Sequence, residues 1–209
     1  MHENSRLMFE RHALAYFRAA SRVLEIGPDG FPSAYRRSVE AGSGRALAWD
    51  TLNLFRDDRL TFVASSEYSF PIESDSYDVV LSGQVIEHVR KPWVWMRELA
   101  RVCKAGGVVI TINPVSWPYH EAPIDCWRAF PEGVRALYEE AALEVLVSEW
   151  GSLELQGFKR YLPGASQEAY GRRRRLVNRV LGHFGVPVER AYDTVTVGQK
   201  SERQPRPAN

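Results

Sequence analysis

The sequence has few cysteines and almost no net charge, and each absence argues against a class of protein. Its two cysteines, Cys103 and Cys126, stand alone, without a CxxC pair or a Cys/His cluster at zinc spacing. A disulfide framework or a cysteine-based zinc site is therefore not expected, and a reducing, cytoplasmic setting is. The 27 Lys and Arg residues nearly balance the 26 Asp and Glu residues. This balance makes nucleic acid or an anionic membrane an unexpected partner.

Long hydrophobic runs are also missing. The longest apolar stretches fall far short of the ~20 residues that cross a bilayer, so no membrane span is expected. The segment from Met1 to Arg22 carries charges throughout and lacks the apolar run of a signal peptide. With 209 residues and 44% hydrophobic content, the chain fits one globular domain. We expect that domain over residues 1–200 and a disordered tail over 201–209, which is polar and rich in proline.

What the sequence does contain is an alternation of short apolar strands with amphipathic helices. The predicted strands cover residues 22–26, 45–49, 61–64, 77–82, 108–112, 143–150 and 194–198. The predicted helices cover residues 5–20, 33–41, 92–103, 131–142 and 169–184. This order predicts an α/β fold: a Rossmann-like, seven-stranded, mostly parallel sheet with helices on both faces. In such a sheet the ligand binds at the carboxyl ends of the strands.

The first two strand ends carry polar residues suited to a nucleotide-like ligand. Gly27 allows a sharp turn close to a ligand, and Glu25 can accept hydrogen bonds from an amino group. Asp50 and Asn53 follow the second predicted strand, at about the distance from a glycine turn where ribose hydroxyls are commonly bound. The alternatives are an ordinary strand-to-helix turn at Gly27 and Asx turns at the other two positions.

Four motifs in a fixed order carry a family resemblance: VLEIG at the first strand, YDVVLS at the fourth, QVIEHV after it, and ELARVCKAGGVVIT before and within the fifth. Over residues 22–150 the chain resembles class I S-adenosylmethionine-dependent methyltransferases. The resemblance implies an enzyme with S-adenosylmethionine as cofactor, a cofactor-binding core over 22–113, and acceptor-side elements over 114–200. It implies cofactor contacts from Glu25, Ile26, Gly27, Asp50, Asn53, Ser66, Glu67, Ser82, Gly83, Gln84 and His88.

Three positions depart from the pattern of this family. Asp29 and Phe31 stand where glycine is common in the first loop, and Ser66 stands where an acid often lies near the adenine. Glu67, next to Ser66, is the candidate substitute. These departures support an alternative reading of the chain as a degenerate Rossmann module that binds a nucleotide or a partner protein without catalysis.

The segment after the fifth predicted strand supplies the acceptor-side candidates. Its HxxPxDxWR pattern, from His120 to Arg128, resembles a branch of bacterial methyltransferases linked to glycans and secondary metabolites. It implies O-methylation of a sugar, a glycan or another small hydroxyl compound. His120 is the preferred general base, because histidine titrates near neutral pH, and His88 is the second candidate. The remaining predicted roles are orientation of His120 by Asp125, an anion contact from Arg128, and an aromatic acceptor platform from Trp117 and Tyr119.

Blander readings compete with these roles. His120, Asp125 and Arg128 would also suit hydrogen bonds that merely hold the loop together, and His88 would suit a helix-start residue bonded to backbone. The run Arg172–Arg175 is either a grip for an acidic acceptor or a solvated face. No metal site is predicted, and N- or C-methylation of another small molecule stays open. These motifs determine neither the acceptor nor the oligomeric state.

Overall fold

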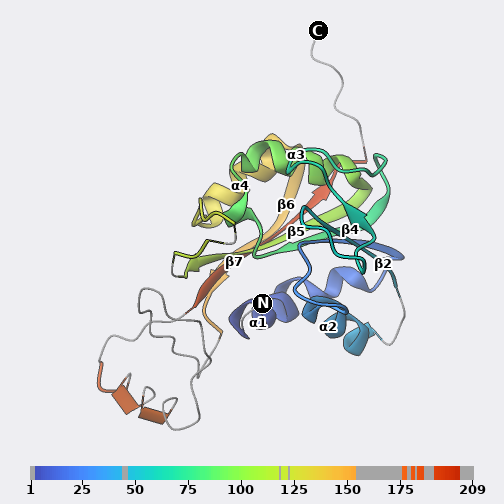
Figure 1. The fold of residues 1–209 in the computed structure, drawn as a ribbon. Coiled ribbons are helices and arrows are strands. Elements are labelled where there is room, and N and C mark those ends of the chain that lie inside the picture. Colours follow the sequence, from blue (N-terminus) through green and yellow to red (C-terminus); the bar gives the residue numbers. More distant parts are fainter. Residues whose placement is uncertain are drawn as a thin grey trace.

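A seven-stranded sheet forms the centre of the molecule (Figure 1). The computed structural model describes residues 3–43, 47–117, 119–121, 123–153, 176–177, 180–181, 183–185 and 191–202. The strands run in the spatial order β3-β2-β1-β4-β5-β7-β6. Strands β1 to β5 are parallel to one another, and β7 is antiparallel to both β5 and β6. The bounds are β1 Arg22–Ile26, β2 Ala48–Asn53, β3 Phe62–Val63, β4 Tyr77–Gly83, β5 Cys103–Ser116, β6 Leu143–Gly151 and β7 Tyr192–Lys200.

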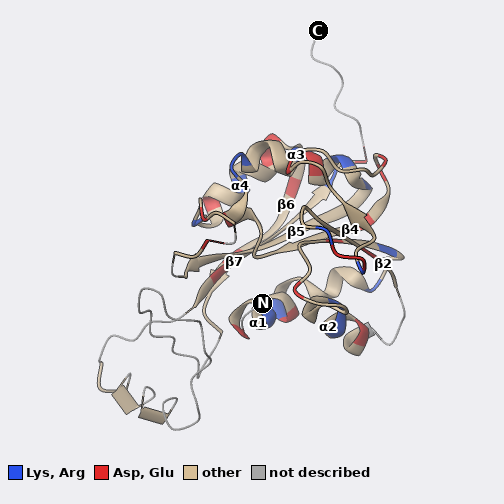
Figure 2. Cartoon of the chain, viewed as in Figure 1, with Lys and Arg blue, Asp and Glu red and all other residues tan. Residues whose placement is uncertain are grey.

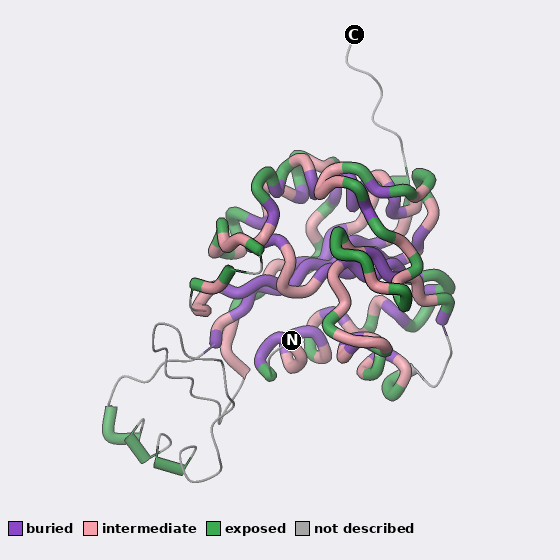
Figure 3. Tube along the Cα trace, in the orientation of Figure 1, coloured by how far each residue is buried: buried purple, intermediate pink, exposed green. Residues whose placement is uncertain are grey.

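Helices cover both faces of this sheet, as Figure 1 shows. Helix α1 (Glu3–His12), the short 3-10 helix η1 (Leu14–Phe17) and helix α2 (Ala34–Ser43) pack on one face, where Phe9 and Val39 are fully buried. Helix α3 (Pro92–Val102) and helix α4 (Pro131–Glu140) pack on the other, where Trp95 and Tyr138 are buried. The sheet between them is the most deeply buried layer (Figure 3). The predicted fold class is confirmed.

The main differences from the predicted elements have local causes. The expected helix over 5–20 is shorter and ends in a 3-10 turn. Strand β2 begins and ends later than expected, and Asp50 inside it pairs with Arg22 and accepts a hydrogen bond from Tyr77. Strand β5 begins at Cys103 and not at Val108 as expected, and the residues Lys104–Gly107 lie at an irregularity in the β4–β5 pairing. Most of the predicted helix over 169–184, the run Arg172–Arg175 and the tail beyond residue 202 lie outside the described residues.

The order of the strands determines where a ligand can enter. The chain runs outward from β1 through β2 to β3 and then returns to β4 on the other side of β1. Connections that leave neighbouring strands in opposite directions open a crevice at their carboxyl ends. Here that crevice lies between the exits of β1 and β4, at Gly27 and Gln84. None of the helices in the described part of the chain is long and apolar enough to cross a bilayer.

Candidate active site

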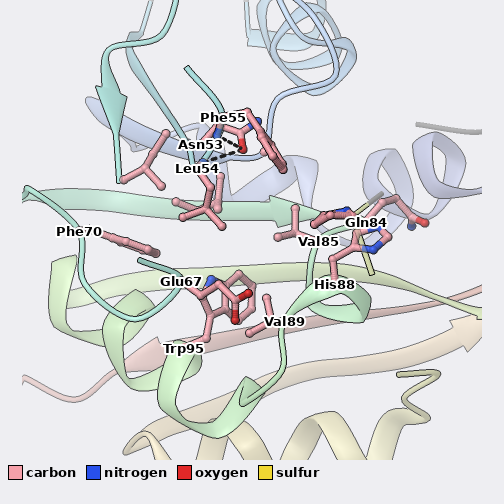
Figure 4. A pocket seen from close by; sticks show the side chains of 14 residues that line it. Asn53, Leu54, Phe55, Glu67, Phe70, Gln84, Val85, His88, Val89 and Trp95 are labelled. Atoms are coloured by element: carbon pink, nitrogen blue, oxygen red, sulfur yellow. Dashed lines mark hydrogen bonds between the residues drawn. The ribbon is translucent and has the colours of Figure 1, made fainter. Parts of the chain in front are cut away.

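A cavity of ≈ 310 Å³ opens at this crevice, a volume within the usual range of small-molecule sites. Figure 4 shows side chains from the ends of β2 and β4 and from helix α3 surrounding one open space. Its walls are mainly apolar, with a small number of polar groups. The lining residues are Ile26, Gly27, Leu52, Asn53, Leu54, Phe55, Glu67, Phe70, Gln84, Val85, His88, Val89, Trp95 and Pro123.

Gly27 forms the inner turn of the cavity and has no room for a side chain. Its φ is +66°, and a Cβ built there would lie 2.6 Å from Cγ2 of Val85. The two departures in the same loop have structural roles of a different kind. Asp29 accepts a hydrogen bond from the backbone N–H of Ala34 at the start of α2, and Phe31 stacks under the guanidinium of Arg59. The loop therefore keeps its essential glycine and uses a side-chain cap at the helix start.

Glu25 is buried beneath the cavity and does not line it. The same oxygen of its carboxyl group accepts hydrogen bonds from Ser33 Oγ at 2.6 Å and from Trp49 Nε1 at 2.8 Å. Burial raises the pKa of Glu25 to about 7, although these two hydrogen bonds oppose the rise. Ile26, the next residue, does line the cavity.

The structure separates the two candidates for the ribose position. Asn53 is the last residue of β2 and lines the cavity, and its Oδ1 accepts the backbone N–H groups of Leu54 and Phe55. Asp50 was expected in the loop after the strand, and that placement is wrong. Asp50 lies three residues inside β2, where its carboxylate accepts hydrogen bonds from Tyr77 at 2.9 Å and Arg22 at 3.1 Å.

After β3, too, only one of two adjacent candidate residues lines the cavity. Glu67 lines the cavity, and its carboxylate accepts hydrogen bonds from the backbone N–H and the guanidinium of Arg90. Ser66 lies beside the cavity without lining it, and its Oγ accepts the backbone N–H of Tyr68. The acidic group at this edge of the cavity is therefore supplied one position later than the family pattern has it.

The exit of β4 brings three predicted residues close together, but only Gln84 lines the cavity. Gln84 has a φ of +60°, and its Nε2 donates to Ser5 Oγ and Asp193 Oδ1. Gly83 is required for packing, because a Cβ there would lie 2.3 Å from the hydroxyl of Tyr35. Ser82 is buried in the strand. The prediction that Ser82 and Gly83 contact the cofactor finds no support in the lining of the cavity.

His88 lies at the rim of the cavity, in the 3-10 turn η2 (Ile86–His88). Its Nδ1 is 2.5 Å from the carbonyl oxygen of Ile124, which can only accept, so Nδ1 carries the proton and Nε2 presents a lone pair. Burial lowers the pKa of His88 and favours this neutral form. This contact matches the alternative in which His88 is bonded to backbone, but the side chain also faces the cavity.

Glu87 is the most unusual group near the rim. Its side chain is 1% exposed, and neither carboxylate oxygen has a hydrogen-bond partner elsewhere in the described part of the chain. Nε2 of His88 lies 3.8 Å from Oε1. Burial raises the pKa of Glu87 to about 8.

The segment after β5 is held against this rim. Asp125, whose side chain is 2% exposed, forms a two-pronged pair with the guanidinium of Arg128 at 2.5 and 2.6 Å. Its Oδ2 also accepts the backbone N–H of His120 and lies 3.4 Å from His120 Nδ1. Burial tends to raise the pKa of Asp125, but Arg128 and the His120 N–H outweigh it and hold that pKa below its usual value.

This arrangement changes the expectation for Arg128. Its guanidinium is engaged by Asp125 and by the carbonyl oxygens of Trp117 and Trp127, so it supports the loop. Its predicted contact with an anionic acceptor stays a prediction. His120 meets His88 edge to face, with ring centroids 4.9 Å apart. Trp117 and Tyr119 do not line the cavity, and Tyr119 is 71% exposed. Their predicted contact with an acceptor stays a prediction.

The apolar walls of the cavity were not anticipated. Leu54 and Phe55 follow Asn53 directly, and both are exposed large side chains, so an apolar pair just past a strand end was the available signal. Phe70 and Trp95 reach the cavity from more distant segments, and no local pattern marks them. Glu87 was recognised only as part of the QVIEHV turn.

Comparisons with known proteins agree with this geometry. Residues 41–111 match the model of a methyltransferase domain family. A methyltransferase from Mycobacterium avium is 42% identical over 98 residues, which is 47% of this chain and 33% of that protein. A methyltransferase from Mycobacterium tuberculosis is 45% identical over 49 residues, or 23% of this chain and 19% of that one. The chain thus matches a third or less of the length of these relatives.

Solved structures share the fold over nearly the whole chain. A methyltransferase from Archaeoglobus fulgidus has a TM-score of 0.59 at 13% identity, covering 93% of this chain and 94% of its own. A phosphoethanolamine N-methyltransferase from Haemonchus contortus, in complex with S-adenosyl-L-methionine, has a TM-score of 0.55 at 15% identity over 95% and 53%. The [4+2]-cyclase SpnF has a TM-score of 0.53 at 17% identity over 94% and 80%.

The chain shares the fold of solved methyltransferases, and its residues 41–111 resemble a methyltransferase domain. The resemblance seen in the sequence is confirmed over residues 41–111, and the matches agree with the prediction of an S-adenosylmethionine-dependent enzyme. The narrower branch indicated by the HxxPxDxWR segment is not addressed by these matches.

Proposed function

We propose that the chain transfers a methyl group from S-adenosylmethionine to a hydroxyl group of a sugar, a glycan or another small molecule. One observation carries this proposal: two histidines, His88 and His120, stand in edge contact at the rim of the cavity where the donor would bind. One of them, His120, has a buried carboxylate beside its ring.

The cavity suits the donor in chemistry as well as in place. The turn at Gly27 brings backbone close to the ligand, and the carboxamide of Asn53 and the carboxylate of Glu67 offer acceptors for hydroxyl and amino groups. Leu54, Phe55 and other apolar walls suit a flat base. When bound, the donor supplies a methyl group already activated by a sulfonium, and the chain has to position the acceptor and exclude water.

A hydroxyl acceptor must also lose its proton. His120 is the residue best placed to take it, because Asp125 lies 3.4 Å from its Nδ1 and Arg128 holds Asp125 in position. An imidazole oriented by a carboxylate is an effective general base near neutral pH. An amine acceptor or a carbon nucleophile depends less on a general base such as His120.

The proposal is tested with the full chain in two steps. Calorimetry with S-adenosylhomocysteine should show one binding site per chain, and methyl transfer from labelled S-adenosylmethionine should then be measured over a panel of hydroxyl, amine and carbon acceptors. For a hydroxyl acceptor, His120→Ala should lower the rate about 10²-fold or more and leave S-adenosylhomocysteine affinity within a factor of two. The neighbouring exposed Glu121→Gln is the matched control.

Three outcomes would overturn parts of the proposal. Transfer only to amine or carbon acceptors, with the His120→Ala rate largely kept, would favour N- or C-methylation. Absence of donor binding at millimolar concentration would favour a non-catalytic module. Donor binding with no transfer to any acceptor would mean that the chain has the fold but does not carry out this reaction, as one fold can serve several reactions.

A further inference from the structure

The rim of the cavity holds a cluster of metal-ligating groups that methyl transfer does not by itself require. Glu87, His88 and His120 each offer one ligand atom, and these atoms all lie within 4.8 Å of one another. Glu87 and His88 are neighbours in the turn η2, and His120 comes from the segment after β5. Two elements separated in the sequence thus bring two imidazoles and one carboxylate together.

We propose that Glu87, His88 and His120 bind a divalent transition-metal ion of the zinc class at the edge of the donor cavity. The donor set has the composition of known catalytic sites, in which three protein ligands leave a position open for water or substrate. Two neutral imidazoles favour a first-row transition ion over Mg²⁺, which prefers all-oxygen surroundings.

The burial of Glu87 is the first independent support. A carboxylate that is 1% exposed and has no hydrogen-bond partner elsewhere in the described chain is costly, because burial removes water without replacing it. A cation bound beside it supplies the missing partner. The His88 imidazole, 3.8 Å from Oε1 of Glu87, lies too far away to do so as a hydrogen-bond donor.

The groups behind the two histidines are the second support. Metal-binding imidazoles usually donate their other N–H to a carbonyl or a carboxylate, which fixes the ring and the lone pair. His88 Nδ1 is bonded to the carbonyl oxygen of Ile124. His120 Nδ1 faces Asp125, which Arg128 holds in turn. The segment that supplies these groups is anchored on η2 through Glu87 O and Cys126 N at 2.7 Å.

The position of the site deepens the proposed function, on which this part of the inference rests. His88 lines the donor cavity, so the open coordination position would face the acceptor. A bound cation lowers the pKa of a coordinated hydroxyl. His120 would then act as a ligand, and the hydroxyl proton would pass to solvent.

The test uses tag-free full chain dialysed against EDTA and titrated with Co²⁺, whose visible absorption reports its ligand geometry, followed by displacement with Zn²⁺. We expect one ion per chain. His120→Ala, His88→Ala and Glu87→Gln should each weaken binding at least 10-fold. The matched controls are Glu121→Gln, beside the site, and His12→Ala on helix α1, and both should bind as the wild type does.

Binding of S-adenosylhomocysteine to metal-free protein keeps the two proposals apart. If donor binding is normal and His120→Ala, shown to be folded by the same donor binding, takes up Co²⁺ as well as the wild type, the metal site is refuted and the methyltransferase proposal stands. Absence of stoichiometric Co²⁺ or Zn²⁺ binding to the wild type refutes it equally. If the ion binds as expected but no donor does, the metal site stands and the proposed reaction fails.

Discussion

At the scale of single residues, the inner turn of the donor cavity leaves no space for a side chain at Gly27. Its positive φ favours glycine, and a Cβ would push against Val85, which itself lines the cavity. The same loop offers a contrast in Gly30. A Cβ there would meet only the carbonyl oxygen of Pro32, at an ordinary 3.6 Å.

We therefore expect Gly27→Ala to lower the free energy of unfolding by about 1–3 kcal/mol, from backbone strain and overpacking together. It should also weaken S-adenosylhomocysteine binding at least 10-fold, measured by calorimetry. Gly30→Ala should change neither by much. Restoration of part of the affinity in Gly27→Ala/Val85→Ala would identify the clash as the cause, and an unchanged affinity in Gly27→Ala would contradict the geometry.

Glu25 gives a prediction about pH. Its pKa is raised to about 7 by burial, whereas in the unfolded chain it lies at its ordinary value near 4.5. Between these values the folded state binds more protons than the unfolded state, so stability falls as pH rises through this window. A difference of this size corresponds to roughly 3 kcal/mol.

Urea unfolding between pH 5 and pH 8 should show this loss in the wild type and not in Glu25→Gln, which stays neutral and can still accept from Ser33 and Trp49. The stability of Glu25→Gln relative to the wild type should therefore increase with pH. The exposed substitution Glu132→Gln is the control. If the free energies of unfolding of the wild type and Glu25→Gln change in parallel with pH, ionisation of Glu25 does not destabilise the folded state.

At the scale of elements, the segment after β5 depends on one ion pair. The side chain of Asp125 is almost fully buried, and the guanidinium of Arg128 pairs with its carboxylate. We expect Arg128→Ala to cost about 1–3 kcal/mol, because it leaves a buried charge without its partner. Amide hydrogen exchange should rise over residues 119–130 more than over the sheet.

The control for this variant is Arg135→Ala. Arg135 lies 3.6 Å from Glu132, whose side chain is 85% exposed, and such surface pairs contribute about 0–1 kcal/mol. Equal effects of the two substitutions would mean that Asp125 does not need its partner.

Helix α1 is attached to the sheet by polar groups. Asn4 is fully buried, donates to Asp193 at 2.6 Å and to the carbonyl of Gly151, and accepts the backbone N–H of Leu153. The same Asp193 accepts from Gln84 of the cavity. The helix and the cavity wall therefore share one network.

Asn4→Ala should lower the free energy of unfolding by about 2 kcal/mol or more, since it leaves buried groups without partners. It should also weaken S-adenosylhomocysteine binding by loosening Gln84. Asn4→Asp keeps the shape of the side chain but places a second carboxylate against Asp193. It should therefore lower the free energy of unfolding more than Asn4→Ala does. If Asn4→Ala and the wild type have the same free energy of unfolding, the network does not stabilise the folded state and contributes only to the specificity of the fold.

At the scale of the whole molecule, two buried clusters sandwich the sheet, and the cavity opens at one edge of it. Charges of both signs are spread over the helices in the view of Figure 2, which agrees with the nearly neutral sequence. A ligand that binds only the folded state stabilises it by mass action.

S-adenosylhomocysteine at 100 times its dissociation constant should therefore raise the free energy of unfolding by about 2.7 kcal/mol. Thermal unfolding at increasing ligand concentration measures this effect. Adenosine and methionine, each carrying half of the contacts, should give smaller shifts. A melting temperature that does not respond to S-adenosylhomocysteine would contradict donor binding in the folded state.

Local patterns in the sequence were sufficient for the class of fold and for the strand ends that form the site. Short apolar segments between turn residues place β1 and β4 within one residue of their observed bounds, because burial on both faces of a sheet demands such runs. Gly27 and Gln84 directly follow β1 and β4, Asn53 ends β2, and Glu67 and His88 lie in the segments after β3 and β4. The topology brings these strand ends and the segments after them to the cavity.

Tertiary structure decided which neighbouring residue is used and what each polar group binds. Asp50 is drawn into β2 by Arg22 and Tyr77, Arg128 is engaged by Asp125, and Phe70 and Trp95 complete the cavity from other segments. The meeting of Glu87 with two histidines likewise depends on how η2 packs against the segment after β5. Except for the pair of Asp125 with Arg128, which are three residues apart, partners distant in the chain set these outcomes, and the spacing of residues along one segment carries no information about them.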